Sequence, residues 1–99
     1  MKEHRFLAEV LDDLETTMNW LDSRREGLGE EFEFEFEFLS AVQVARSRPD
    51  TFSADQTGYR PVKLKRFSAV MYFTIDDNVV VVGGVFMGGR SESKLRNRG

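Results

Sequence analysis

Hydrophobic residues between positions 7 and 21 recur at steps of three and four, which is the spacing of one face of an α-helix. This spacing predicts an amphipathic helix over residues 8–24. The glycines at 27 and 29 follow it, and glycine tolerates the backbone angles of a helix stop. The apolar face comprises Leu7, Val10, Leu11, Leu14, Met18 and Leu21, and the acidic residues Glu9, Asp12, Asp13, Glu15 and Asp22 lie largely opposite.

Glutamate and phenylalanine alternate over residues 31–38, and this period of two, taken alone, indicates a β-strand. A strand would leave residues 39–48 without a role, whereas a helix uses the whole segment. We therefore predict a helix from Glu30 to about Ser47, ended by Arg48-Pro49. Its two apolar stripes are Phe34, Phe38, Val42 and Ala45, and beside them Phe32, Phe36 and Leu39.

Three short apolar segments then predict strands at 62–67, 70–76 and 79–86. Their two-residue separations favour antiparallel hairpins. The valines at 79–82 suit a central strand with neighbours on both sides. The expected fold is α+β, a helical hairpin packed on a small antiparallel sheet in the order β-α-α-β-β-β.

The remaining segments are shorter or more polar. Residues 2–7 fit either a short strand or the lead-in to a helix. Residues 49–61 are rich in turn formers and form a connecting loop, with Phe52 and Tyr59 as anchors onto the core. The tail from Arg90 to Gly99 is hydrophilic and basic, and we expect it to be mobile.

The length of 99 residues, of which 40% are apolar, indicates one globular domain spanning 1–99. So small a core gives marginal stability, which a binding partner would increase. The chain has no cysteine, which excludes disulfides and a cysteine-ligated zinc site. Its start is charged where a signal peptide is apolar, and no apolar run approaches a membrane span, so we expect a cytoplasmic protein.

Charge is distributed unevenly along the chain. Residues 1–58 carry 14 acidic and six basic residues, a net charge of −8, whereas residues 59–99 carry three acidic and eight basic residues, a net charge of +5. The second part can therefore present a basic surface to an anionic target although the formal net charge is −3.

Several short motifs follow one another along most of the chain. They are Phe6 to Leu14 with Asp13-Leu14, Trp20, Gly27-Leu28-Gly29 with Phe32, Pro49 with Phe52, and Arg60, Leu64, Arg66-Phe67, Val70 and Tyr72. Their order and spacing resemble those of the ParE/RelE toxin superfamily. Leu21 stands where a Tyr is common in that family. After the valine-rich strand many relatives carry a His and two Arg, where this chain has Met87-Gly88-Gly89-Arg90.

The resemblance implies the toxin of a type II toxin–antitoxin module, a class used in plasmid stabilization. ParE-like members bind DNA gyrase and stall it on cleaved DNA, and a cognate antitoxin protein neutralises them. RelE-like members are ribosome-dependent mRNA endoribonucleases. We expect a ParE-like gyrase inhibitor with no membrane association and no cofactor; an RelE-like ribonuclease and an inactive relative that only binds antitoxin are the alternatives.

Candidate target-binding residues are basic or aromatic and lie in the second part of the chain. Lys63 and Lys65 alternate along a predicted strand, so both would lie on one face, as an anion site requires and as an ordinary solvated face also allows. The single His4 lies far from them in sequence, and no catalytic constellation emerges. The candidates are Arg60, Lys63, Lys65, Arg66, Tyr72 and Arg90.

Candidate antitoxin-binding residues are the apolar side chains of the two helices: Leu14, Met18, Trp20, Phe34 and Phe38. Their simpler role is in the hydrophobic core, although nine Phe in so small a domain leave some for a partner helix to cover. The glutamates at 31–37 disperse around a helix, which disfavours a metal site. Gly83-Gly84 and Gly88-Gly89 lack the spacing of a phosphate loop and indicate a bulge or a strand end.

Overall fold

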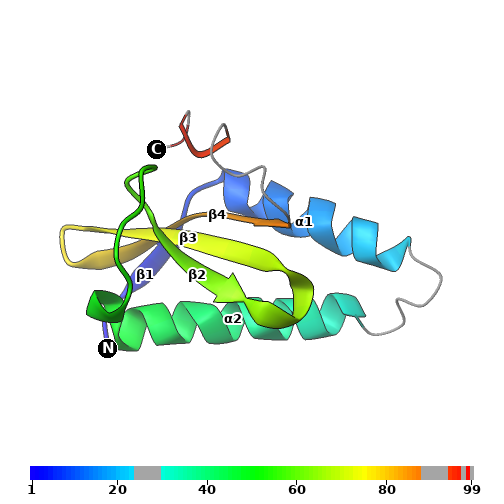
Figure 1. Ribbon diagram of the computed structural model, residues 1–99, viewed down its shortest axis with the longest axis horizontal. Helices are drawn as coiled ribbons and strands as arrows, with labels where there is room; N and C mark the ends of the chain where they lie inside the picture. Colours follow the sequence, from blue (N-terminus) through cyan, green and yellow to red (C-terminus); the bar gives the residue numbers. More distant parts are fainter. Residues whose placement is uncertain (24–29, 88–93, 97, 99) are drawn as a thin grey trace.

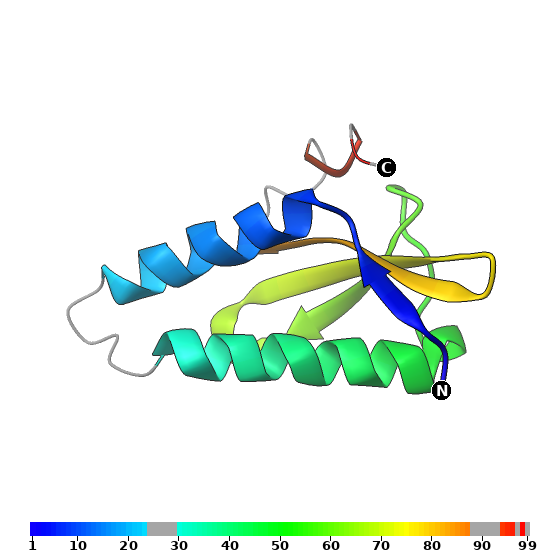
Figure 2. The same ribbon diagram turned by 180° about the vertical axis from the view of Figure 1, so that it is seen from behind.

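The computed structural model describes residues 1–23, 30–87, 94–96 and 98 of the chain. The helical hairpin packs against one face of a four-stranded sheet (Figures 1 and 2). The elements are β1 (His4–Phe6), α1 (Glu9–Asp22), α2 (Glu30–Ser47), the 3₁₀ turn η1 (Pro49–Thr51), β2 (Arg60–Leu64), the 3₁₀ turn η2 (Lys65–Phe67), β3 (Ala69–Asp76) and β4 (Val79–Met87).

The sheet is mixed, with the strand order β1-β4-β3-β2. β4 lies between β1 and β3, as its run of valines predicts. β2, β3 and β4 are antiparallel neighbours, but β1 runs parallel to β4, so the prediction of a wholly antiparallel sheet is wrong. The physical reason is the connection: the helical hairpin that follows β1 returns the chain across one face of the sheet, and such a crossover permits parallel pairing.

α1 follows the predicted face in part. Val10 and Leu21 are buried, and Leu14 and Met18 pack partly buried against the core. Leu11 was assigned to this face but is 71% exposed, because the buried side of the helix turns toward β4 and away from it. The four buried residues of α1 are Val10, Asp13, Thr17 and Leu21.

α2 confirms the helical interpretation of the Glu-Phe repeat and has the predicted bounds. Two residues advance a helix by about 200°, so alternate phenylalanines project in nearly opposite directions. Phe34 and Phe38 are buried at 0% and 1% exposure, whereas Phe32 and Phe36 are 71% and 74% exposed. The repeat therefore supplies core and surface with the same residue type.

A tight turn and a bulge shape the β3–β4 hairpin. Asp77 and Asn78 both have positive φ, 52° and 65°, as a two-residue hairpin turn of type I′ requires. Gly83 is the extra residue of β4, between the pairs Phe73–Val82 and Tyr72–Gly84. This confirms the prediction of a bulge at the glycine pair. Because the bulge shifts the alternation by one residue, Val80, Val82 and Val85 all face the core.

β2 ends at Leu64, earlier than the predicted strand, which extended to residue 67. Lys65–Phe67 instead form η2, and Ser68 adopts the left-handed backbone conformation with φ 53°. This turn directs Phe67 into the core, where its ring meets that of Phe34 edge to face at a centroid distance of 5.4 Å. Lys63 and Lys65 therefore do not alternate on one strand.

A smaller cluster covers the face of the sheet that lies away from the helices, called the outer face below. Tyr72, Phe86 and Leu95 are buried there, with Tyr59 and Val70 packed partly buried against them. Leu95 is 2% exposed, so the described part of the basic tail is packed on the sheet, in contrast to the expected mobile tail. The sequence analysis judged this tail by its charge, but Leu95 provides an apolar anchor.

Candidate functional site

The largely apolar groove between the two helices is the surface best suited to bind another molecule. Val10 and Phe38 form its floor and are almost fully buried, while Leu11, 71% exposed, stands on its rim. The groove has a volume of about 470 Å³. We call it the hairpin groove; its apolar lining consists of Phe6, Val10, Leu11, Leu14, Met18, Phe38 and Leu39.

Three elements position this lining. α1 and α2 diverge from the joined end of the hairpin, and β1 runs between the end of α2 and the start of α1 (Figure 2). Phe6 of β1 lines the groove, and its ring lies 6.0 Å from that of Phe38. Glu15, Asn19 and Glu35 supply the polar part of the rim. An elongated apolar floor with an acidic rim fits an amphipathic helix that carries basic residues beside its apolar face.

The structure places the antitoxin-binding candidates in different surroundings. Leu14, Met18 and Phe38 line the hairpin groove. Phe34 is fully buried against Phe67 and has no exposed surface to offer a partner. Trp20 is half exposed and does not line the groove, so its expected place in the core is wrong. Only three of the five candidates come together.

Among the target-binding candidates, Arg60 interacts with its own fold. Its Nη1 donates to the carbonyl of Pro49 at 2.8 Å and lies 3.7 Å from the carboxylate of Asp50. Its guanidinium also lies 5.9 Å from the centroid of the Phe73 ring. These contacts join β2 to η1 and to β3.

The other candidates are dispersed. Lys63 is exposed on the outer face, where it lies opposite Val70. Tyr72 is on the same face, but it is only 8% exposed and is buried beneath Leu95. Lys65 is exposed in η2, and Arg66 makes an ion pair of 2.7 Å with Glu33 of α2. Arg90 lies outside the described residues, as do Gly88-Gly89 and the Gly27-Leu28-Gly29 motif.

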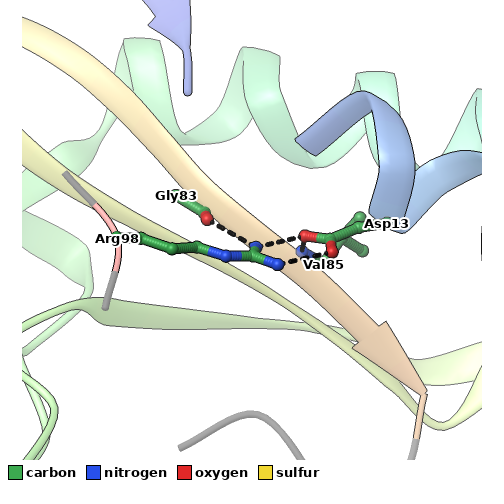
Figure 3. A network of polar contacts seen from close by, with 4 residues as sticks. All are labelled: Asp13, Gly83, Val85 and Arg98. Carbon is green, nitrogen blue, oxygen red and sulfur yellow. Dashed lines mark hydrogen bonds and ion pairs between the residues drawn. The ribbon is translucent and has the colours of Figure 1, made fainter. Parts of the chain in front are cut away.

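A buried ion pair that the sequence analysis did not find links Asp13 of α1 to Arg98 (Figure 3). Arg98 Nη1 and Nη2 donate to the two carboxylate oxygens of Asp13, at 2.5 and 2.8 Å. The side chain of Asp13 is only 5% exposed and that of Arg98 only 10%. The guanidinium also lies 5.0 Å from the centroid of the Phe86 ring.

The pair completes the hydrogen bonding of an uncovered strand edge. β1 leaves the edge of β4 after Leu7 donates its N–H to the carbonyl of Val82. Beyond that point Arg98 donates to the carbonyl of Gly83 at 3.0 Å, and Val85 donates its N–H to Asp13 at 3.3 Å. An unpaired buried backbone group is costly. The side chains of Asp13 and Arg98 therefore continue the hydrogen bonding along the β4 edge that the backbone of β1 begins.

The pKa of Arg98 is raised above its ordinary, strongly alkaline value, mainly because the guanidinium donates a hydrogen bond to Asp13. Desolvation opposes this effect, and the nearby charge of Asp13 adds to it. The sequence contained a signal for a buried ion pair, because Asp13 shares the helical spacing of Val10, Thr17 and Leu21. A carboxylate on the buried side of a helix requires a cationic partner. Nothing in the sequence identified Arg98 as that partner.

No cluster of three or more His, Cys, Asp or Glu side chains suited to a metal ion occurs in the described part of the chain. Neither described helix is long and apolar enough to cross a membrane. His4, the sole histidine, is exposed on β1 and packs edge to face on Phe6.

Comparison with known proteins adds no assignment: the sequence matches no protein-family model, and no curated protein is significantly similar to it.

Proposed function

We propose that this chain is the toxin of a type II toxin–antitoxin module, a ParE-like member of the ParE/RelE superfamily. The observation that carries the proposal is the hairpin groove, an apolar surface across two helices of a small domain, which a neutralising antitoxin helix would cover. The element order β-α-α-β-β-β and the motifs that resemble the superfamily support the same interpretation.

The antitoxin segment would place its apolar side chains in the groove beside Leu14, Met18 and Phe38. Glu15 and Glu35 on the rim favour lysine or arginine on the flanks of that segment. Because the core of this domain is small, the bound antitoxin would also stabilise the toxin fold through mass action.

The proposed target is DNA gyrase, and inhibition would require binding and no catalysis of its own. Arg60 and Tyr72 are engaged within the fold, so the exposed Lys63 and Lys65 are the better candidates for target contact. If so, replacing both lysines by alanine will weaken growth inhibition and leave the unfolding free energy nearly unchanged, since both side chains are exposed. Unchanged toxicity of this double variant would remove the lysines from the target site.

An RelE-like ribonuclease is the second candidate function, because Lys63 and Tyr72 occupy the same face of the sheet. A nuclease needs a general acid or base within reach of the ribose. Tyr72 would have to emerge from beneath Leu95 to serve as one. An inactive relative that only binds antitoxin is the third candidate, since Met87 stands where many relatives carry His.

Induced expression in a bacterium distinguishes the three functions when viability, DNA breaks and mRNA integrity are scored together. Growth arrest with DNA breaks supports a gyrase poison, and arrest with cut mRNA and intact DNA supports a ribonuclease. Normal growth with retained antitoxin binding indicates the inactive relative. Co-expression of a neighbouring gene for a small DNA-binding protein should restore growth.

The groove itself is tested with a matched pair of surface variants. Leu11→Glu places a charge on the groove rim at a residue that is already exposed, so the fold should persist while antitoxin affinity falls at least tenfold. Val44→Glu alters an exposed apolar residue of α2 outside the groove and should bind normally. Equal affinity of both variants would place the antitoxin elsewhere.

A further inference from the structure

α2 carries a second apolar surface, distinct from the floor of the hairpin groove and directed away from the core. Phe32, Phe36, Leu39 and Gln43 follow one another at steps of four, three and four residues, the spacing of a helix–helix seam. Phe32 is 71% exposed, Phe36 74% and Leu39 48%. We call these four residues the α2 stripe.

Leu39 lies at the border of the hairpin groove, whereas Phe32, Phe36 and Gln43 lie outside it. Phe36 also borders an open cleft of about 520 Å³ on the side of α2 that faces η2, where Arg66 is paired with Glu33. α2 extends along one side of the molecule in both views (Figures 1 and 2). All four side chains of the stripe are exposed, so it is accessible to a partner.

We propose that the α2 stripe binds a second copy of this chain, with the two α2 helices antiparallel about a two-fold axis near Leu39. A two-fold interface uses the same patch on both copies, so the patch must complement itself when reversed. In this arrangement Leu39 meets its equivalent, Phe36 packs on Gln43 of the other copy, and Phe32 packs on the aliphatic stem of Arg46.

The distribution of charge along α2 selects the antiparallel direction. The first half of the helix carries Glu33, Glu35 and Glu37, and the last turn carries Arg46. A parallel pair would place each glutamate near its equivalent, and like charges repel. An antiparallel pair places Glu35 of one copy beside Arg46 of the other, on the same side of the seam, twice per dimer.

Arg46 is already oriented for this role. Its Nε donates to the carbonyl of Lys2 at 2.7 Å, and its Nη1 lies 3.3 Å from the side-chain oxygen of Gln43. Fixing the side chain in advance reduces the entropy lost on association. The three apolar side chains offer roughly 300–400 Å² per copy, below the about 800 Å² per partner of a standard interface, so the dimer should be weak and reversible.

The first experiment measures the mass of the purified full-length chain by sedimentation velocity from low to high micromolar concentration. We expect a reversible shift from monomer to dimer. Phe36→Glu should weaken it at least tenfold, whereas Leu11→Glu, at the groove rim, should leave it unchanged. A monomer at every concentration, or a dimer that Phe36→Glu does not weaken, overturns the proposal and leaves the stripe to a partner of another sequence.

A charge exchange tests the antiparallel direction separately. Glu35→Lys and Arg46→Glu should each abolish the dimer, because both cross-contacts in each homodimer become repulsive. A one-to-one mixture should dimerise again, because each contact then joins opposite charges. Circular dichroism checks that Arg46→Glu folds without its bond to Lys2. Failure of two folded variants to associate when mixed would refute the antiparallel pairing.

Discussion

Replacing Arg98 by methionine should destabilise the fold far more than an ordinary surface substitution. The variant leaves the Asp13 carboxylate buried, with the Val85 N–H as its remaining hydrogen-bond donor among the contacts described above. Removing one partner of a buried pair costs about 3–5 kcal/mol, and low exposure of both side chains leaves little solvent screening. We expect a loss near the lower end, about 3 kcal/mol, because the Val85 N–H still donates to the Asp13 carboxylate.

Urea unfolding followed by circular dichroism measures this loss. A domain of this length has a total stability of roughly 5–15 kcal/mol, so about 3 kcal/mol shifts the midpoint clearly. Hydrogen exchange at the Val85 amide gives a local readout, since its acceptor is Asp13. In the double variant Asp13→Leu with Arg98→Met, the loss should be smaller than the sum of the single losses by about 2 kcal/mol.

The matched control is Arg5→Met, which removes an ion pair of 3.6 Å with Asp76 whose side chains are 55% and 71% exposed. Exposed pairs contribute little, so this change should stay within about 0.5 kcal/mol. If Arg98→Met cost no more than Arg5→Met, or if the double variant showed simple additivity, the buried pair would not stabilise the fold and our reasoning would be refuted.

Three further predictions concern stability. Phe34→Ala should cost about 3–5 kcal/mol in urea unfolding, whereas Phe36→Ala, in the same repeat, should stay within about 0.5 kcal/mol of the parent when both are measured as monomers. Gly83→Ala should be destabilising by about 1–3 kcal/mol, because the added Cβ would lie only 2.4 Å from the Tyr59 ring; a neutral result in the same assay would contradict the close contact. The pKa of Arg98 is raised above an already strongly alkaline value, so its stabilising contribution is fully present at neutral pH and is lost only at strongly alkaline pH. The stability difference between the parent and Arg98→Met should therefore not change through Arg98 ionisation between about pH 6 and 9, as urea titrations at several pH values can check.

The elements with a strong local signal were predicted well. α2 has its expected bounds because the apolar stripe and the Arg48-Pro49 stop act within the helix itself. β3 and β4 follow their β-branched segments closely. The direction of β1 was predicted wrongly, because three residues contain no information about which neighbour they will pair with.

The candidate site was predicted less completely, for a physical reason. Hydrophobic periodicity treats every carboxylate as solvated, so Asp13 was assigned to the surface. Its partner Arg98 lies 85 positions away in the sequence, where no local pattern can reveal it. Lys65 was placed in a strand because nothing local shows that Phe67 must turn into the core. Spacing placed Leu14 and Met18 on one helix face and Phe38 on another, but the groove that they line together depends on how the two helices sit on the sheet.

The pairing of β1 with β4 also affects how the protein emerges during synthesis. His4 lies opposite Val80, so the ribosome makes β1 and both helices long before the strand that completes their packing. Until the β3–β4 hairpin appears, the nascent helices have no sheet on which to bury Phe34 and Phe38. This interval makes the growing chain a substrate for chaperones that bind exposed apolar segments, and a candidate for aggregation if they are scarce.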